Sequence, residues 1–275
     1  MSTLTVAAIQ MKAHESKREN LSRAEALLDT AVKKGARIVA LPELFNFLGT
    51  PETMRANAES IPGPTTDMLC AKARSNKVYI LGGSIAEKAG DAGKTYNTST
   101  LINPSGKIIA RYSKIHLFDV EISTRVSVKE SDTFSPGNKL VTAETGYGVV
   151  GLSICYDLRF PELYGGLTLR GAKIIFVPAA FMATTGKDHW EPLLKARAIE
   201  NQVYVIAPDV FGPVPGTNIV THGRSLIIDP WGTVLAQAAD AEGVITAELD
   251  FDYLQRVRAG LPSLAHRKPE VYRAD

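Results

Sequence analysis

Residues 149–162, VVGLSICYDLRFPE, place a single cysteine directly after an apolar, β-branched run and shortly before a Pro-Glu helix start. This order predicts a strand, a sharp turn that carries Cys155, and a helix from about residue 161. Such a turn holds a nucleophile at the edge of a sheet, where backbone N–H groups can receive an oxyanion. Taken alone, Cys155 has a simpler interpretation as a structural residue, because free cysteine is among the most buried residue types.

Outward from this stretch, short apolar runs alternate with amphipathic segments along the whole chain. We expect strands at 4–11, 37–42, 78–83, 97–103, 107–112, a run ending at 155, 173–178, 203–207, 224–229, 233–237 and 244–250. We expect helices at 16–34, 65–76, 161–170, 188–201 and 251–259. A capping box at Ser16–Glu19 is expected to start the first helix, and Gly35 to end it.

This alternation predicts an α/β fold class with two βαβ-rich halves packed as layers around one core. No linker rich in Gly, Pro or Ser divides the sequence, so residues 1–275 are expected to form a single domain. The first ten residues are interpreted as a strand and not as a secretory signal. No apolar stretch has the length needed to cross a bilayer.

Charge and cysteine content narrow the class of protein. The formal net charge is +2 and no Lys/Arg run occurs, so neither a nucleic acid nor a membrane partner is expected. The two cysteines, Cys70 and Cys155, are too few for a disulfide framework or a tetrahedral zinc site. We therefore expect a reducing, cytoplasmic compartment. The five histidines are scattered, so no metal is expected.

Three expected strand ends carry a polar group that could do chemistry. Glu43 follows the run ARIVALP, Lys114 follows RYS, and Cys155 is the third. Singly, Glu43 and Lys114 are ordinary surface residues. Together they suit acyl transfer, since a thiolate can attack a carbonyl carbon, a carboxylate can take the thiol proton, and an ammonium can stabilise an oxyanion.

Three motifs resemble the signatures of the nitrilase, or carbon–nitrogen hydrolase, superfamily. They are LPELF at 41–45, YSKIHLF at 112–118 and ICYDLRFPE at 154–162. They occur in the order and at the spacing typical of that family. The resemblance continues through GKDHWE at 186–191, ARAIENQVY at 196–204 and DPWG at 229–232, so it covers essentially the whole chain.

The resemblance implies a four-layer α-β-β-α sandwich and a cofactor-free amidase. Glu43 would be the general base, Lys114 the stabiliser of the oxyanion, and Cys155 the nucleophile. The backbone N–H of Tyr156 would complete the oxyanion hole. Glu130 fits a second carboxylate that holds the lysine in family members; the alternative is an ordinary loop carboxylate.

Within the superfamily, the chain is most similar to small stand-alone amidases, which include deaminated-glutathione amidases and omega-amidases. Arg159 matches the residue that receives the substrate carboxylate in this branch, and a guanidinium suits that task. The alternative is a structural ion pair with Asp157 or Glu162. Phe181 and Thr185 match pocket residues, although Phe181 is also readily a core aromatic.

The expected reaction is hydrolysis of the primary amide of a small carboxylate-bearing substrate to an acid and ammonia, through a cysteine thioester. Pro161 and the tail at 265–272 favour deaminated glutathione, whereas the Thr-Thr-Gly at 184–186 is shared with omega-amidases acting on 2-oxoglutaramate or 2-oxosuccinamate. The stretch 208–221 departs from both groups and would alter the specificity if it borders the pocket.

Three other possibilities remain open from the sequence. A nitrilase or a carbamoylase would use the same trio, and a non-catalytic scaffold could keep the same fold. A thiol oxidoreductase is disfavoured because no Cys-x-x-Cys is present. The resemblance also implies a homodimer or higher homo-oligomer, paired through the helix after the nucleophile and through the tail at about 260–275.

Overall fold

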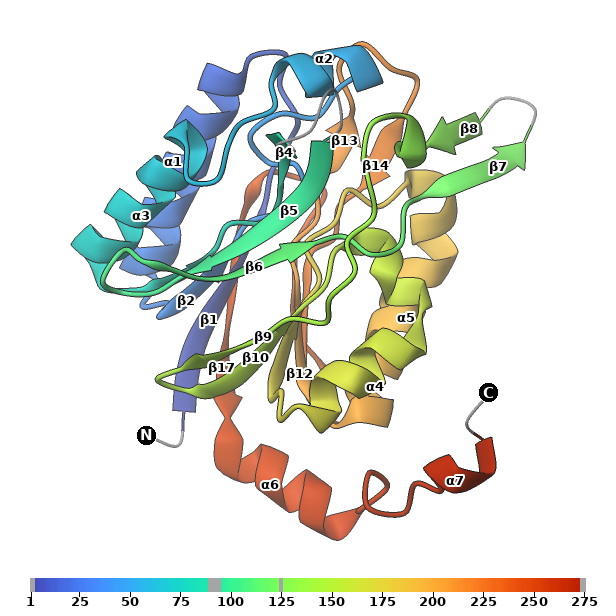
Figure 1. Ribbon diagram of the computed structural model, residues 1–275. Helices are drawn as coiled ribbons and strands as arrows, with labels where there is room; N and C mark the ends of the chain where they lie inside the picture. The colour runs from blue at the N-terminus through green and yellow to red at the C-terminus, as the bar shows by residue number, and fades with distance from the viewer. Residues whose placement is uncertain (1–2, 89–94, 124–125, 273–275) are drawn as a thin grey trace.

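A computed structural model describes residues 3–88, 95–123 and 126–272 of the chain. Two β-sheets stack face to face, and a pair of helices covers the outer face of each, as Figure 1 shows. The outer layers are α1 (Lys17–Lys33) with α3 (Pro64–Asn76), and α4 (Pro161–Leu169) with α5 (Ala183–Asn201). The expected four-layer α-β-β-α sandwich is confirmed.

The first sheet has seven strands. Their order is β17 (Gly243–Asp250), β1 (Thr3–Gln10), β2 (Ile38–Ala40), β3 (Tyr79–Leu81), β5 (Thr95–Ile102) and β4 (Ile85–Lys88), with β6 (Ile108–Ser113) also pairing β5. The second sheet has six, in the order β16 (Val234–Gln237), β15 (Leu226–Ile228), β12 (Tyr204–Ala207), β11 (Ile174–Phe176), β10 (Gly148–Leu152) and β9 (Thr142–Thr145).

Smaller elements complete the described part of the chain. They are α2 (Pro51–Ala56), α6 (Phe251–Gly260), α7 (Pro269–Tyr272), the hairpin of β7 (Asp119–Ser123) and β8 (Val126–Lys129), the hairpin of β13 (Phe211–Pro213) and β14 (Val220–His222), and 3-10 turns at Glu130–Asp132 and Cys155–Arg159.

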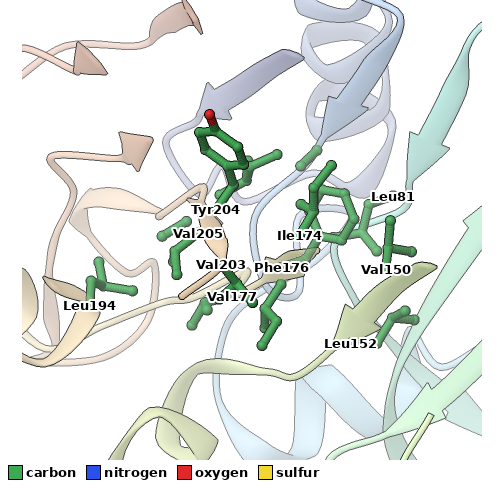
Figure 2. Packing of buried hydrophobic residues seen from close by; sticks show 14 of the residues in the cluster. Leu81, Val150, Leu152, Ile174, Phe176, Val177, Leu194, Val203, Tyr204 and Val205 are labelled. Atoms are coloured by element: carbon green, nitrogen blue, oxygen red, sulfur yellow. The ribbon is translucent and has the colours of Figure 1, made fainter. Parts of the chain in front are cut away.

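The sandwich forms because central strands such as β1 and β2 are apolar on both faces. In β1, Val6 and Ala8 lie in the core between the sheets, whereas Ala7 and Ile9 lie in the core beneath α1 and α3. This alternation follows from the two-residue period of a strand. Figure 2 shows the larger core, where side chains from β3, β10, β11, β12 and α5 meet.

The two halves of the chain each build one sheet, as expected from the element order, with the exception of β17. β17 returns to the first sheet and pairs antiparallel with the full length of β1. This pairing covers the edge of β1. Because β1 is buried almost throughout, it would otherwise present an unpaired apolar edge to solvent.

Local start signals were partly wrong. Ser16 is the N-cap of α1, but its side chain caps no backbone N–H, so the expected capping box is not formed. Helix α5 begins at Ala183 and not near residue 188. The Gly186 inside it is needed for packing, because a Cβ there would lie 2.4 Å from the His222 ring. The strand end expected at Cys155 was also misplaced, since β10 stops at Leu152 and Cys155 opens a 3-10 turn.

Parallel pairing brings the carboxyl ends of several strands to one end of the sandwich. β1, β2 and β3 run parallel in one sheet, and β10, β11 and β12 run parallel in the other. Segments that follow these strands therefore meet above the sheets, where open α/β sheets commonly bind ligands. Across the described ranges, no helix is long and apolar enough to span a membrane.

Candidate active site

One pocket collects nearly all the residues singled out from the sequence. It is lined by Glu43, Glu130, Cys155, Tyr156, Arg159, Phe181 and Thr185, together with mainly apolar side chains. Lys114 lies directly behind this lining and contacts two of its carboxylates. Segments that follow β2, β6, β10 and β11 thus contribute to one site.

Lys114 is enclosed between two carboxylates. Its Nζ donates to Glu43 Oε1 at 3.0 Å and to both Glu130 oxygens at 2.9 Å. Only 1% of the Lys114 side chain is exposed, so its interpretation as a surface ammonium is wrong. Burial lowers the pKa of Lys114, but the charges of Glu130 and Glu43 outweigh burial and hold that pKa well above its usual value. Lys114 is therefore a fixed cation.

Glu43 is equally buried and its orientation is fixed by three donors. Asn97 Nδ2 donates to Oε1 at 2.7 Å beside the Lys114 ammonium, and the backbone N–H of Ala180 donates to Oε2 at 2.8 Å. The carboxylate is thus saturated on Oε1 but keeps acceptor capacity on Oε2. The interpretation of Glu43 as a solvated loop residue is wrong, since it is 2% exposed.

Glu130 joins the lysine to a neighbouring loop. Besides binding Lys114, its Oε2 accepts from the backbone N–H of Phe118 at 2.8 Å. Burial raises the pKa of Glu130, the Lys114 ammonium opposes this, and the Glu43 charge adds to it, with a net increase. Two carboxylates therefore share one ammonium.

Cys155 is held in a sharp turn. Its φ is +46°, a left-handed conformation that costs free energy for a residue with a Cβ. The backbone N–H of Cys155 donates to Pro178 O at 2.9 Å, which ties the turn to the segment after β11. Burial and the charge of Glu43 raise the pKa of the Cys155 thiol, and Lys114 only partly opposes them. The resting thiol is therefore protonated and needs a base.

The buried carboxylate of Asp157 connects the turn of Cys155 with the loop of Lys114. Asp157 Oδ2 accepts from Tyr112 OH at 2.6 Å and from the Ile154 N–H at 2.9 Å. Its Oδ1 lies 2.7 Å from His116 Nδ1. These bonds use residues on both sides of Lys114 and next to Cys155, so Asp157 fixes the two loops relative to each other.

Arg159 lines the pocket, and among the described residues it forms no salt bridge with a carboxylate of its own loop. The described residues give it no salt bridge to Asp157, whose oxygens are occupied, or to Glu162, which is exposed. Its guanidinium lies 5.4 Å from the ring centroid of Phe181 and 5.8 Å from that of Tyr156. The structural ion pair expected as an alternative is therefore absent there.

Phe181 serves both as core residue and as pocket wall. It is buried, its ring packs 5.1 Å from that of Trp190, and it lines the pocket beside Thr185. The stretch 208–221 does border the pocket, because Val214, Ile219 and Thr221 contribute to the lining. This hairpin, β13–β14, is thus placed where it can affect specificity.

Several members of the site were not found from the sequence. Asn97 and the Ala180 N–H bind Glu43, and the apolar lining includes Leu44, Leu48, Met54, Phe118 and Phe134. A backbone donor carries no residue-type signal. Asn97 does carry such a signal, because an amide side chain within a buried strand needs a polar partner. Over the described ranges, no group of three or more His, Cys, Asp or Glu side chains is arranged to hold a metal ion.

The carbon–nitrogen hydrolase family model matches residues 5–259. The chain belongs to the carbon–nitrogen hydrolase family. Deaminated glutathione amidase of Synechocystis is 48% identical over 97% of this chain and 99% of its own length. Omega-amidase NIT2 of mouse is 40% identical over 99% of this chain and 98% of its own. The crystal structure of Saccharomyces cerevisiae Nit3, a member of branch 10 of the nitrilase superfamily, superposes with a TM-score of 0.86 at 34% identity, covering 95% of each chain.

These comparisons confirm the superfamily that the three sequence motifs indicated. As a carbon–nitrogen hydrolase of this family, the chain is an enzyme with a cysteine, a glutamate and a lysine at the pocket. The match includes every segment that contributes to the pocket.

Proposed function

We propose that this carbon–nitrogen hydrolase is an amidase that releases a small 2-oxo acid from its distal amide through a thioester on Cys155. The observation that supports this proposal is that Cys155, Glu43 and Lys114 lie together at one pocket, which Arg159 also lines. Three groups suited to acyl transfer and one suited to carboxylate binding occupy the same cavity.

In the first half-reaction, Cys155 Sγ attacks the amide carbon while Glu43 Oε2 accepts the thiol proton. Oε2 is the suitable oxygen, because Oε1 already accepts from Asn97 and Lys114. As the C–N bond breaks, Glu43 returns the proton to the nitrogen, and a neutral amine leaves. The product on the protein is a thioester of Cys155.

In the second half-reaction, a water occupies the place of the amine. Glu43 takes a proton from it, the hydroxyl adds to the thioester carbon, and the C–S bond breaks. The proton passes to Cys155, which restores the thiol and releases the acid. Glu43 acts as base and acid in both halves.

The negative charge on the substrate oxygen is stabilised by the Lys114 ammonium and by the backbone N–H of Tyr156. Both positions suit this task, because Lys114 is a buried fixed cation and Tyr156 follows Cys155 in the turn. Donors oriented in advance, in a site that excludes water, stabilise such charge strongly. Glu130 keeps Lys114 in place by accepting from it with both oxygens.

The proposed substrate is deaminated glutathione, the substrate in the name of the Synechocystis relative. Arg159 would bind its 2-oxo carboxylate, with Phe181 and Thr185 forming the adjacent wall. In this compound the amide nitrogen belongs to cysteinylglycine. The released amine is therefore that dipeptide, which differs from the expectation of a primary amide and ammonia.

Omega-amidase activity is the second candidate, favoured by the similarity to NIT2 over nearly the whole chain. Deaminated glutathione and 2-oxoglutaramate both yield 2-oxoglutarate. One assay of 2-oxoglutarate therefore compares them directly, with Cys155→Ala as the blank. Higher kcat/KM for deaminated glutathione supports the first proposal, and the reverse order supports omega-amidase activity.

Three results would contradict this function. An active Cys155→Ala variant excludes the thioester mechanism. Inactivity on both amides, with turnover of a nitrile or an N-carbamoyl compound, would indicate a nitrilase or carbamoylase. Failure of Cys155 to react with any amide or electrophile would indicate a scaffold.

We further propose that the chain acts as a single domain and as a cytoplasmic homo-oligomer. The return of β17 to the first sheet supports one domain. Exposed apolar side chains on α4, α5 and the tail, including Leu169, Ile199 and Val271, support pairing through those elements. Light scattering of the purified protein would test the assembly.

A further inference from the structure

Asp209 is a completely buried carboxyl group that the proposed mechanism does not use. It follows β12, has no exposed surface, and has no salt-bridge partner within the described part of the chain. An ionised carboxylate without a cation is costly to bury. Such a group requires a structural or functional reason.

The hydrogen bonds of Asp209 lead to the segment 178–181, which contacts the catalytic residues. Asp209 Oδ1 accepts from the backbone N–H of Phe181 at 2.9 Å. The preceding N–H, that of Ala180, donates to Glu43 Oε2 at 2.8 Å, and Pro178 O accepts from the Cys155 N–H at 2.9 Å. Four consecutive residues therefore contact the nucleophile, the base and Asp209.

The end of this segment is held by a backbone hydrogen bond, from the His222 N–H to Phe181 O at 2.7 Å, and by a side chain. Ala179 is bonded on both sides, by its N–H to Pro208 O and by its C=O to the Val210 N–H. At Phe181 the N–H has a side chain, Asp209, as its acceptor in place of a backbone carbonyl. Asp209 is in turn anchored from behind, since its own N–H donates to Ser225 Oγ at 2.9 Å.

We propose that Asp209 is a positioning residue that sets the orientation of Glu43 Oε2 relative to Cys155 through segment 178–181, and that it does so as a neutral carboxylic acid. It touches neither substrate nor reacting atoms. The inference goes beyond the proposed function and rests on it only for the role of Glu43 as base.

The surroundings of Asp209 explain why the neutral form is the functional one. Burial raises the pKa of Asp209 well above its usual value, and the nearby charge of Glu43 adds to this. The backbone N–H groups of Phe181, Val210 and Gly223 oppose the increase but do not cancel it. Asp209 Oδ2 has no hydrogen-bond partner among the described residues. An ionised Asp209 would place another negative charge near Glu43, which already shares the Lys114 cation with Glu130.

The test measures how fast iodoacetamide alkylates Cys155, because that rate reports the arrangement of thiol and base without turnover. Peptide mass spectrometry follows Cys155 and Cys70 separately in wild type, Asp209→Asn, Asp209→Leu and Asp209→Ala. Cys70 on α3 is an internal control for folding. Tyr204→Phe is the matched control, as it removes a hydrogen bond of β12, the strand before Asp209, but none that reaches segment 178–181.

We expect Asp209→Asn to alkylate within about threefold of wild type, because asparagine keeps an acceptor oxygen and is neutral. Asp209→Leu lacks the acceptor, and we expect its Cys155 rate to fall by about tenfold to a hundredfold, the usual effect of a small misplacement. Cys70 rates should stay equal. We expect kcat with the amide substrate to fall in parallel and KM to change less.

A folded Asp209→Leu protein with a Cys155 rate within threefold of wild type overturns the proposal. If leucine prevents folding, Asp209→Ala, which adds no bulk, decides in the same way. A tenfold loss in Asp209→Asn overturns the neutral form. If wild type turns over no amide, the proposed function fails, while the alkylation rates still decide the role of Asp209.

Discussion

The ammonium of Lys114 lies 3.0 Å from Glu43 Oε1, although 71 residues separate the two along the chain. Each side chain is at most 2% exposed, so their charges interact with little screening by water. Glu130 binds the same ammonium from another side, at 2.9 Å. The carboxyl group of the proposed base, Glu43, therefore has its orientation fixed before any substrate arrives.

Replacing Lys114 by Met should both destabilise the protein and abolish turnover. The change leaves two buried carboxylates adjacent and without a cation, and breaking a buried ion pair costs about 3–5 kcal/mol. Urea unfolding gives the first quantity and 2-oxoglutarate release the second. The control is Lys107→Met, the same exchange at an exposed position. A Lys114→Met protein as stable as this control would contradict the prediction.

Arg159→Lys should raise KM with little change in kcat. A lysine keeps the charge but loses the two-pronged guanidinium, and a hydrogen bond to a charged group contributes about 1.5–3 kcal/mol, or about 10- to 100-fold in KM. Initial rates with a carboxylate-bearing amide and with a neutral amide separate the effects. An equal loss on the neutral amide would show that Arg159 supports the pocket and does not bind the carboxylate.

Tyr112→Phe should reduce activity as well as stability. It removes a donor to the buried Asp157, which connects the loops of Lys114 and Cys155, at a cost of about 1–3 kcal/mol. Tyr204→Phe is the matched control, since its hydroxyl donates to Asp250 O at 2.8 Å far from the pocket. We expect the temperature of thermal unfolding to be lower in both variants than in wild type. We expect kcat to be lower only in Tyr112→Phe. Equal kcat values in the two variants would argue against a connecting role for Asp157.

The buried carboxyl group of Asp209 should make the free energy of unfolding depend on pH. Burial raises its folded-state pKa above the ordinary value of 3.8, so between the two values the folded protein retains a proton that the unfolded chain has lost. Stability from this group therefore falls as the pH rises through that interval. Asp209→Asn lacks this proton, so its stability relative to wild type should increase with pH, by at most about 1.4 kcal/mol per unit. Urea unfolding from about pH 5 to 8 measures this difference, and a pH-independent difference would contradict it.

The sequence was sufficient to identify the candidate residues whose side-chain type suits them to catalysis. Glu43 and Cys155 each follow a buried apolar strand of a parallel pair, and such strands deliver these positions to one edge. Lys114 follows β6, which pairs antiparallel with β5. The strand expected to end at Cys155 ends three residues earlier, at Leu152, and Cys155 itself has φ +46°, which a strand residue does not adopt. The capping box expected at Ser16 does not form either, because the local motif alone does not determine which hydrogen bonds the folded chain makes.

What the sequence by itself determined is the alternation of strands and helices, the family, and the candidate trio, because these depend on local periodicity and on residue types at short range. Only the tertiary structure decided that β17 closes the first sheet, that Asn97 and the Ala180 N–H orient Glu43, and that Asp209 lies beneath the same segment. The physical reason is that these relationships depend on backbone donors and on burial. Both arise only when segments distant in sequence pack together and exclude water.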